Sequence, residues 1–137
     1  MAEPPVFVLD TFALLAYLQD EIGAARVQTL LENAAKEKCR LCISIINLGE
    51  LLYIIERREG IAKTQDVLGL VRQLPLEILP ADEETVFAAA HIKAGHALSY
   101  ADSFAVACAI QEKATVLTSD PEFESVESLI PMEWLKE

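Results

Sequence analysis

Short, mainly apolar segments of strand length alternate along this chain with longer segments of helical periodicity. The clearest are residues 6–9, which read VFVL, and residues 41–45, which read LCISI. Neither shows the regular apolar–polar alternation of a strand with one face in water, so we expect both to be buried on both faces. Buried strands separated by helices are typical of a parallel sheet covered on both sides. The sequence therefore predicts an α/β fold with a central parallel sheet.

The same pattern predicts the remaining elements. Further strands are expected at 76–79 and 115–118, with a short fifth strand near 130–134, which makes four to five strands in all. Helices are expected near 12–19 and 24–37, and then at 47–59, 61–73, 82–94 and 100–113. The last of these is apolar nearly all round, which predicts a helix buried at the centre of the domain.

The size of the chain suits one domain. It has 137 residues, 53% of them hydrophobic, and no linker or repeat, so residues 1–137 are expected to form a single domain. No apolar run approaches the roughly 18 residues of a membrane span, and the N-terminus does not resemble a signal peptide. Three cysteines cannot all pair with one another. A reducing cytoplasm is therefore the expected location.

The net charge narrows the range of partners. The chain has 22 acidic and 11 basic residues, a formal net charge of −11. Tight binding to duplex DNA normally needs a basic face, so this charge argues against it. A nuclease whose acids hold divalent metals is compatible with the charge, because bound metals reverse the local sign.

Four acidic residues are expected at one edge of the predicted sheet. Asp10 ends the first strand, and Asp120 follows the strand at 115–118 by two residues. Glu50 lies in the first turns of the helix after the second strand, and Asp102 opens the buried helix. Ligands of open α/β sheets bind outside the carboxyl ends of the strands. These four carboxylates are therefore the candidate site.

Each acid also has a purely structural interpretation, and for any single acid that interpretation is the more common one. Residues at helix starts act as N-caps, capping boxes pair residues three apart, and Asp-Pro initiates turns. The residues concerned are Asp10 or Thr11 as a cap, Asn47 to Glu50 and Ser99 to Asp102 as capping boxes, and Asp120 with Pro121 as a turn.

Taken together, the four acids favour a metal site. At a mean separation of ~8 Å and an effective dielectric of ~20, each of the six pairs repels by about 2 kcal/mol, or about 12 kcal/mol in total. This rivals the roughly 5–15 kcal/mol stability of a small domain. Such a pocket must raise its pKa values, recruit a cation or bind metal, and oxygen ligands alone favour Mg²⁺ or Mn²⁺. Two such ions about 4 Å apart support phosphodiester cleavage.

The four acids lie in the segments VFVLDT at 6–11, INLGEL at 46–51, LSYADSFA at 98–105 and TSDPEF at 118–123. These segments resemble the acidic motifs of PIN-domain ribonucleases, and the small prokaryotic toxins of the VapC type are the most similar. The resemblance covers nearly the entire chain and implies a PIN-like fold. It also implies Mg²⁺ or Mn²⁺ ligation and catalysis by Asp10, Glu50, Asp102 and Asp120, with the hydroxyls of Thr118 and Thr11 orienting water or a carboxylate.

The resemblance further implies a substrate and partners. Members of this family cleave single-stranded or looped RNA such as tRNA or rRNA, form homodimers, and are blocked by an antitoxin that places a basic side chain in the pocket. We therefore expect an endoribonuclease toxin with a cognate antitoxin and a homodimer contact on exposed apolar helix surface. Phe12 departs from the small or polar residue usual beside the first acid.

Two other functions match parts of the pattern. A PIN-like module without catalysis would use its acidic pocket only to bind a basic partner, which suits the net charge. A signalling receiver domain is also a small α/β domain with an acidic metal site. It needs an acidic pair before its phosphoacceptor and a lysine after a late strand, and Leu9-Asp10 and TSD at 118–120 supply neither.

Two further features are weaker indicators of function. Arg57 follows Glu50 by about two helical turns, where it either contacts substrate phosphate or remains a solvated surface side chain. Cys39 and Cys42 form a lone C-x-x-C that leads into a strand. No second pair completes a zinc site, so both cysteines are expected to be structural.

Overall fold

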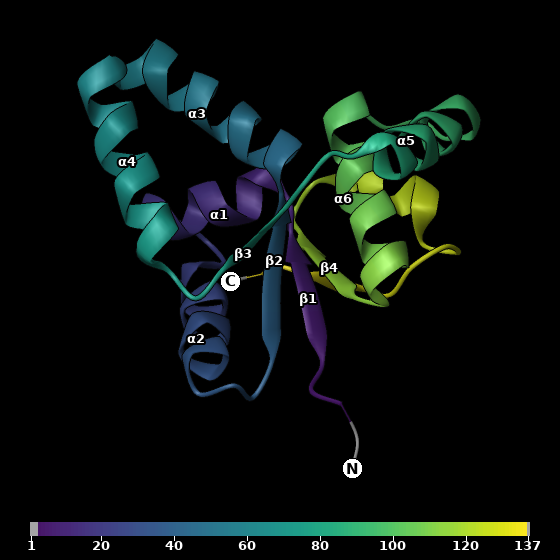
Figure 1. The fold of residues 1–137 in the computed structure, drawn as a ribbon, viewed down its shortest axis with the longest axis horizontal. Helices are drawn as coiled ribbons and strands as arrows, with labels where there is room; N and C mark the ends of the chain where they lie inside the picture. Colours follow the sequence, from purple (N-terminus) through teal and green to yellow (C-terminus); the bar gives the residue numbers. More distant parts are fainter. Residues whose placement is uncertain (1–2, 137) are drawn as a thin grey trace.

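The computed structural model describes residues 3–136 and contains a five-stranded parallel sheet (Figure 1). The strands lie in the spatial order β3-β2-β1-β4-β5, and every neighbouring pair is parallel. They are β1 (Val6–Leu9), β2 (Arg40–Ser44), β3 (Glu77–Leu79), β4 (Thr115–Thr118) and β5 (Met132–Trp134). The predicted α/β fold is confirmed, including the short fifth strand at the sheet edge.

Within residues 3–136, six α-helices connect the strands, each within two residues of its predicted bounds. A short 3-10 helix, η1, follows β4 and was not predicted. None of the described helices combines the length and the apolar composition that crossing a bilayer requires. The bounds are α1 (Thr11–Leu18), α2 (Ala24–Ala35), α3 (Ile45–Glu59), α4 (Ile61–Gln73), α5 (Glu83–Gly95), α6 (Tyr100–Glu112) and η1 (Pro121–Val126).

Both faces of the sheet are covered, as the apolar strands predicted. Successive strand residues point to opposite faces. Leu9 and Leu117 therefore pack against helices α1 to α4, whereas their neighbours Val8 and Val116 pack against α5, α6 and η1. Figure 1 shows these two groups of helices on opposite sides of the strands. The result is a three-layer structure with one apolar core on each face of the sheet.

The strand order reverses between β1 and β4. From β1 the chain moves outward to β2 and β3 through α1 to α4 on one face of the sheet. It then returns to β4 through α5 and α6 on the other face. The carboxyl ends of β1 and β4 therefore flank a crevice, which is where open α/β sheets bind ligands.

Helix α6 is buried at the centre of the second core, as predicted. Eight of its thirteen residues are buried, and three of these are alanines at positions 105, 107 and 109. Such small side chains let a helix lie close to the strands beneath it. The position of Asp102 is therefore set by a rigid element.

The two cysteines of the C-x-x-C segment face different cores. Cys39 packs in the core beside α1 to α4, and Cys42 packs on the opposite face of β2. Both are buried and unpaired. The segment is therefore part of the cores, as expected, and makes no disulfide.

Gly23 is expected to resist substitution. Its φ is +97°, and an added Cβ would lie 3.0 Å from Cδ1 of Leu135. Gly23→Ala should therefore lower the free energy of unfolding by about 1–2 kcal/mol, because the residue combines a left-handed backbone with a close contact. Gly69→Ala in α4 is the control, since its Cβ would meet no atom within 4 Å. Gly69→Ala should raise the free energy of unfolding by about 0.5–1 kcal/mol. The measurement is urea unfolding, and equal changes in the two variants would contradict the prediction.

Candidate active site

Asp10 is a buried carboxylate at the carboxyl end of the central strand. Its exposed fraction is 0%, and both of its oxygens are engaged. Oδ1 accepts a hydrogen bond of 2.7 Å from the backbone N–H of Ala13, which makes Asp10 the N-cap of α1. Oδ2 accepts one of 2.6 Å from the Thr118 hydroxyl. Burial outweighs these hydrogen bonds and raises the pKa of Asp10 to about 6, with repulsion from Asp120 and Glu50 adding to the shift.

Thr118 joins the ends of β1 and β4. Its buried hydroxyl donates to Asp10 and accepts a hydrogen bond of 3.0 Å from the backbone N–H of Asp120. The carboxylate of Asp120 accepts one of 2.9 Å from the N–H of Glu122 and so caps η1. The structural and functional interpretations of these acids therefore apply together, because a capping carboxylate can also face the crevice.

Asp102 lies in the first turn of α6 with an exposed fraction of only 4%. Burial is the largest cause that raises its pKa, to about 7, followed by repulsion from Asp10. Repulsion from Asp120 and Glu50 contributes further. The Ser99 hydroxyl accepts from the Asp102 N–H at 3.1 Å, which confirms half of the expected capping box.

Glu50 reaches the site from the second turn of α3. The proposed capping box from Asn47 to Glu50 is wrong, because Ser44 is the N-cap and accepts from the N–H of Ile46 at 3.1 Å. Asn47 therefore lies inside the helix. The Oε1 atom of Glu50 is buried without a hydrogen-bond partner among the described residues. This unpaired oxygen is available to a cation.

Asn47 ties together the three helices that carry the site. Its Nδ2 donates to Oγ1 of Thr11 at 3.3 Å and to the carbonyl of Ala101 at 3.0 Å. The Thr11 hydroxyl in turn donates to the Asn47 carbonyl at 3.1 Å. Thr11 is thus bonded to the backbone of α3, and of the two expected hydroxyls only that of Thr118 bonds to a site carboxylate. The network joins α1, α3 and α6.

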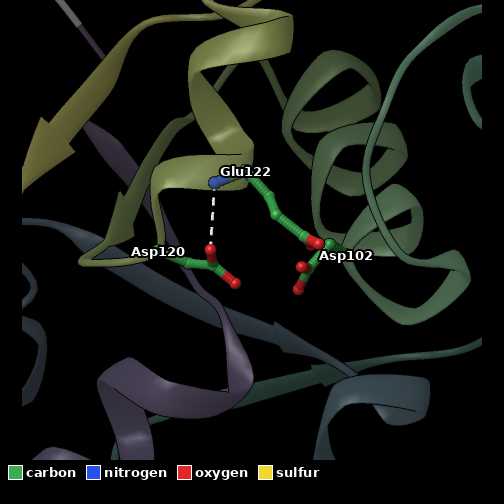
Figure 2. Close-up of side chains that lie close together, drawn as sticks. All are labelled: Asp102, Asp120 and Glu122. Atoms are coloured by element: carbon green, nitrogen blue, oxygen red, sulfur yellow. Dashed lines mark hydrogen bonds between the residues drawn. The ribbon is translucent and has the colours of Figure 1, made fainter.

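Glu122 is an acid of the crevice that the sequence reasoning missed. One carboxylate oxygen from each of Asp102, Asp120 and Glu122 lies within 4.8 Å of the others (Figure 2). Figure 2 shows the Asp102 and Glu122 side chains meeting from α6 and η1. The Glu122 Oε2 atom also accepts a hydrogen bond of 3.4 Å from the N–H of Ser99. The available signal was its place two residues after Asp120, at the start of a short helix.

The four predicted acids are brought within electrostatic range of one another. Asp10 and Asp102 each experience repulsion from Glu50 and Asp120, and Asp102 also from Asp10. They come from four separate segments of the chain. Among the described residues, the group of acids within 4.8 Å of one another includes Asp102 and Asp120 with Glu122, but not Asp10 or Glu50. An all-carboxylate donor set with an unpaired buried oxygen fits a hard divalent cation such as Mg²⁺ or Mn²⁺.

Arg57 is held on the surface of its own helix. Its guanidinium carbon lies 4.9 Å from the centroid of the Tyr53 ring, in the geometry of a cation–π contact. The side chain is exposed. Contact between Arg57 and a substrate phosphate stays a prediction.

Comparison with known proteins identifies the family and the fold. Residues 7–129 match the family model of the PIN domain, whereas none of the curated proteins matches this chain. Among solved structures, the chain is similar to VapBC2 from Rickettsia felis bound to a promoter DNA fragment, with 22% identity, a TM-score of 0.73 and coverage of 96% of this chain and 99% of that one. DNA-bound VapBC from Salmonella typhimurium has 24% identity and a TM-score of 0.72, and the match covers 95% of this chain and 98% of that one. The sarcin-ricin loop cleaving toxin VapC20 from Mycobacterium tuberculosis has 17% identity and a TM-score of 0.67, and the match covers 88% of this chain and 94% of that one.

The metal-free protein is expected to lose stability as the pH rises from about 4 to 7. The pKa values of Asp10 and Asp102 are raised on folding from 3.8 to about 6 and about 7, so the folded state binds more protons in this range and unfolding becomes easier with rising pH. Asp102→Asn removes one of these charges. In the presence of a chelator it should be more stable than the wild type at pH 7 by about 2 kcal/mol, and nearly equal to it at pH 4.

The control for this measurement is Asp66→Asn, which replaces an exposed acid on α4. As a substitution on the exposed surface, it should change the free energy of unfolding by no more than about 0.5 kcal/mol. Urea unfolding at pH 4, 5, 6 and 7 provides the comparison. The prediction fails if the stability of Asp102→Asn relative to the wild type is the same at pH 4 and at pH 7. That result would show that folding does not disfavour the ionised form of Asp102.

Proposed function

Because this chain belongs to the PIN domain family, we propose that it is a divalent-metal-dependent endoribonuclease and the toxin of a toxin–antitoxin pair. The observation that carries the proposal is that Asp10, Glu50, Asp102 and Asp120 lie within electrostatic range of one another, beside the carboxyl ends of β1 and β4. Folding brings these like charges together although it raises the pKa of two of them, to about 6 and about 7. Such a cluster is most readily explained by a cationic ligand.

We propose that Asp10, Glu50, Asp102 and Asp120 hold Mg²⁺ or Mn²⁺, with Glu122 as a further carboxylate beside them. Bound divalent ions lower the pKa of water and stabilise negative charge on a phosphoryl group and its leaving oxygen. The chain's own contribution is to keep the donors in place. Thr118 orients the Asp10 carboxylate, Ser99 caps the turn that carries Asp102, and Asn47 holds α1, α3 and α6 in register.

The proposed substrate is single-stranded or looped RNA, such as a segment of tRNA or rRNA. The structural similarity to a sarcin-ricin loop cleaving toxin supports this class of substrate. A net charge of −11 disfavours long contacts with an RNA backbone. Recognition is therefore expected to depend on the metal site and on local contacts near the cleaved bond.

The proposed partners are a cognate antitoxin and a second copy of the chain. The similarity to VapBC complexes supports the antitoxin, which would place a basic side chain among the site carboxylates. Large apolar side chains on helix surfaces support a homodimer contact, among them Phe87, Ile61 and Ile110, which are 64%, 57% and 49% exposed. Three unpaired cysteines suit a reducing cytoplasm, where an RNA substrate is also present.

Cleavage of RNA should require both metal and Asp102. We expect the pure, antitoxin-free protein to cut a structured RNA pool with Mg²⁺ or Mn²⁺ and not with a chelator. Asp102→Asn should reduce the rate by at least about a hundredfold, since even residues that only support a metal ligand contribute 10–100-fold. Asp66→Asn on the exposed surface of α4 should cut like the wild type. If the metal-loaded wild type cuts no RNA, the alternative is favoured in which a PIN-like module without catalysis binds a basic partner in its acidic pocket.

Metal binding should be visible without any substrate. A ligand that binds only the folded state at about 100 times its Kd adds about 2.7 kcal/mol of stability. Mn²⁺ should therefore raise the Tm of the wild type by several degrees, and Asp120→Asn should lose most of that rise. Glu122→Gln should lose part of it if Glu122 contacts the ion. An unchanged Tm at millimolar Mn²⁺ would argue against the carboxylates as a metal site.

A further inference from the structure

A cavity of about 600 Å³ opens beside the acidic cluster. Its walls include Phe12 and Leu15 of α1, the turn at Asp20 to Ile22, and Ser119. Phe12 follows Asp10 by two residues, and Ser119 directly precedes Asp120. The cavity and the acidic cluster therefore share the two chain segments that leave β1 and β4. A molecule bound at the cluster can extend into this cavity.

The cavity presents apolar surface to solvent. Phe12 and Ile22 are 39% and 55% exposed, although both are large and apolar. On α1 the core is covered by Leu14 and Leu15, which are nearly fully buried. Covering the core therefore does not explain why Phe12 and Ile22 are large and apolar. An exposed aromatic ring beside a candidate nuclease site is the type of surface on which a nucleobase stacks.

The polar wall of the cavity is acidic. Asp20 and Glu21 line it next to Ile22, and both are exposed. Carboxylates repel phosphate groups but accept hydrogen bonds from the amino groups of bases. These carboxylates therefore disfavour the phosphate backbone of a nucleic acid in this cavity and favour a base with an exocyclic amine.

We propose that this cavity binds one nucleobase of the RNA, adjacent to the phosphodiester that lies at the carboxylate cluster. The base stacks on Phe12, and its amino group donates to Asp20 or Glu21. This inference rests on the proposed function and adds a source of sequence preference to it. Adenine, cytosine and guanine carry an exocyclic amine with two N–H donors. Uracil offers only its N3–H, which lies between two carbonyl oxygens that carboxylates repel, so uracil is the disfavoured base.

Binding of short RNA tests the role of Phe12 directly. Fluorescein-labelled hexamers of cytidylate, adenylate and uridylate are titrated with protein in Mg²⁺, with anisotropy as the readout and the RNA length checked on gels. Stacking on an aromatic side chain contributes about 1–3 kcal/mol per base, or roughly 5- to 150-fold in Kd. Phe12→Ala should therefore weaken the binding of the cytidylate and adenylate hexamers about tenfold or more, and Phe12→Trp should retain it.

Leu129→Ala is the matched control. Leu129 is a large apolar side chain between η1 and β5 that is 42% exposed, close to the 39% of Phe12, and it does not line the cavity. That variant should bind all three hexamers like the wild type. Thermal unfolding checks that the Phe12 variants fold, which is expected because Phe12 is exposed. Equal affinities of Phe12→Ala and the wild type, or no hexamer binding by the wild type at millimolar concentration, would overturn the inference.

The acidic wall is tested through base preference. Asp20 has a φ of +52°, a conformation that Asn also tolerates, so Asp20→Asn is a mild substitution. In Asp20→Asn with Glu21→Gln, the preference for cytidylate over uridylate should fall toward one, because an amide both donates and accepts. If the double variant keeps the wild-type preference for cytidylate over uridylate, Asp20 and Glu21 do not recognise the base.

Cleavage of the same hexamers separates this inference from the proposed function. If the wild type cuts RNA and Phe12→Ala has the same KM and affinity, the base site is wrong and the nuclease proposal is unaffected. If the wild type binds RNA through Phe12 but never cuts it, the base site is supported and the nuclease proposal fails.

Discussion

The burial of one carboxylate at the end of the central strand organises both the fold and the site. Asp10 uses one oxygen to start α1 and the other to receive the Thr118 hydroxyl from β4. Removing a carboxylate from water is unfavourable unless hydrogen bonds or a cation compensate for it. The hydrogen bonds here compensate only in part, since the pKa of Asp10 stays raised at about 6. The crevice between β1 and β4 is therefore built around a charge that the protein alone does not neutralise.

Most of the fold could be predicted because its strands are apolar on both faces. In a chain of this size, a short apolar run such as VFVL is best explained as a strand buried on both faces. The helix ends near Gly60 and before Pro75 follow from the backbone chemistry of glycine and proline. The start of α3 was predicted two residues too late, because Ser44 is both the last residue of β2 and the N-cap of α3. Its role as N-cap depends on where β2 ends, which the local sequence does not specify.

Three of the four carboxylates could be predicted from the rule that sites lie at the carboxyl ends of strands, and Asp102 from its place at the start of the buried helix. Their neighbours could not be predicted in this way. Glu122 joins Asp102 and Asp120 because it lies at the start of η1, and a 3-10 helix of six residues leaves little trace in sequence. The resemblance to PIN-domain ribonucleases implied that the Thr11 hydroxyl orients water or a carboxylate. It instead donates to the backbone of α3, which is a contact between residues 36 positions apart. The cavity at Phe12 likewise depends on the path of the turn at Asp20 to Ile22 in space.

The distance along the chain between the members of the site has a consequence for synthesis. Thr118 and Asp10 are hydrogen-bonded although 108 positions separate them, and Asp120 lies further along still. The site is complete only once β4 has been synthesised, because β4 carries Thr118 and is followed by Asp120. A polypeptide that stops before β4 contains Asp10, Glu50 and Asp102 but lacks the hydroxyl that joins β4 to the end of β1. Such a fragment therefore cannot form the crevice.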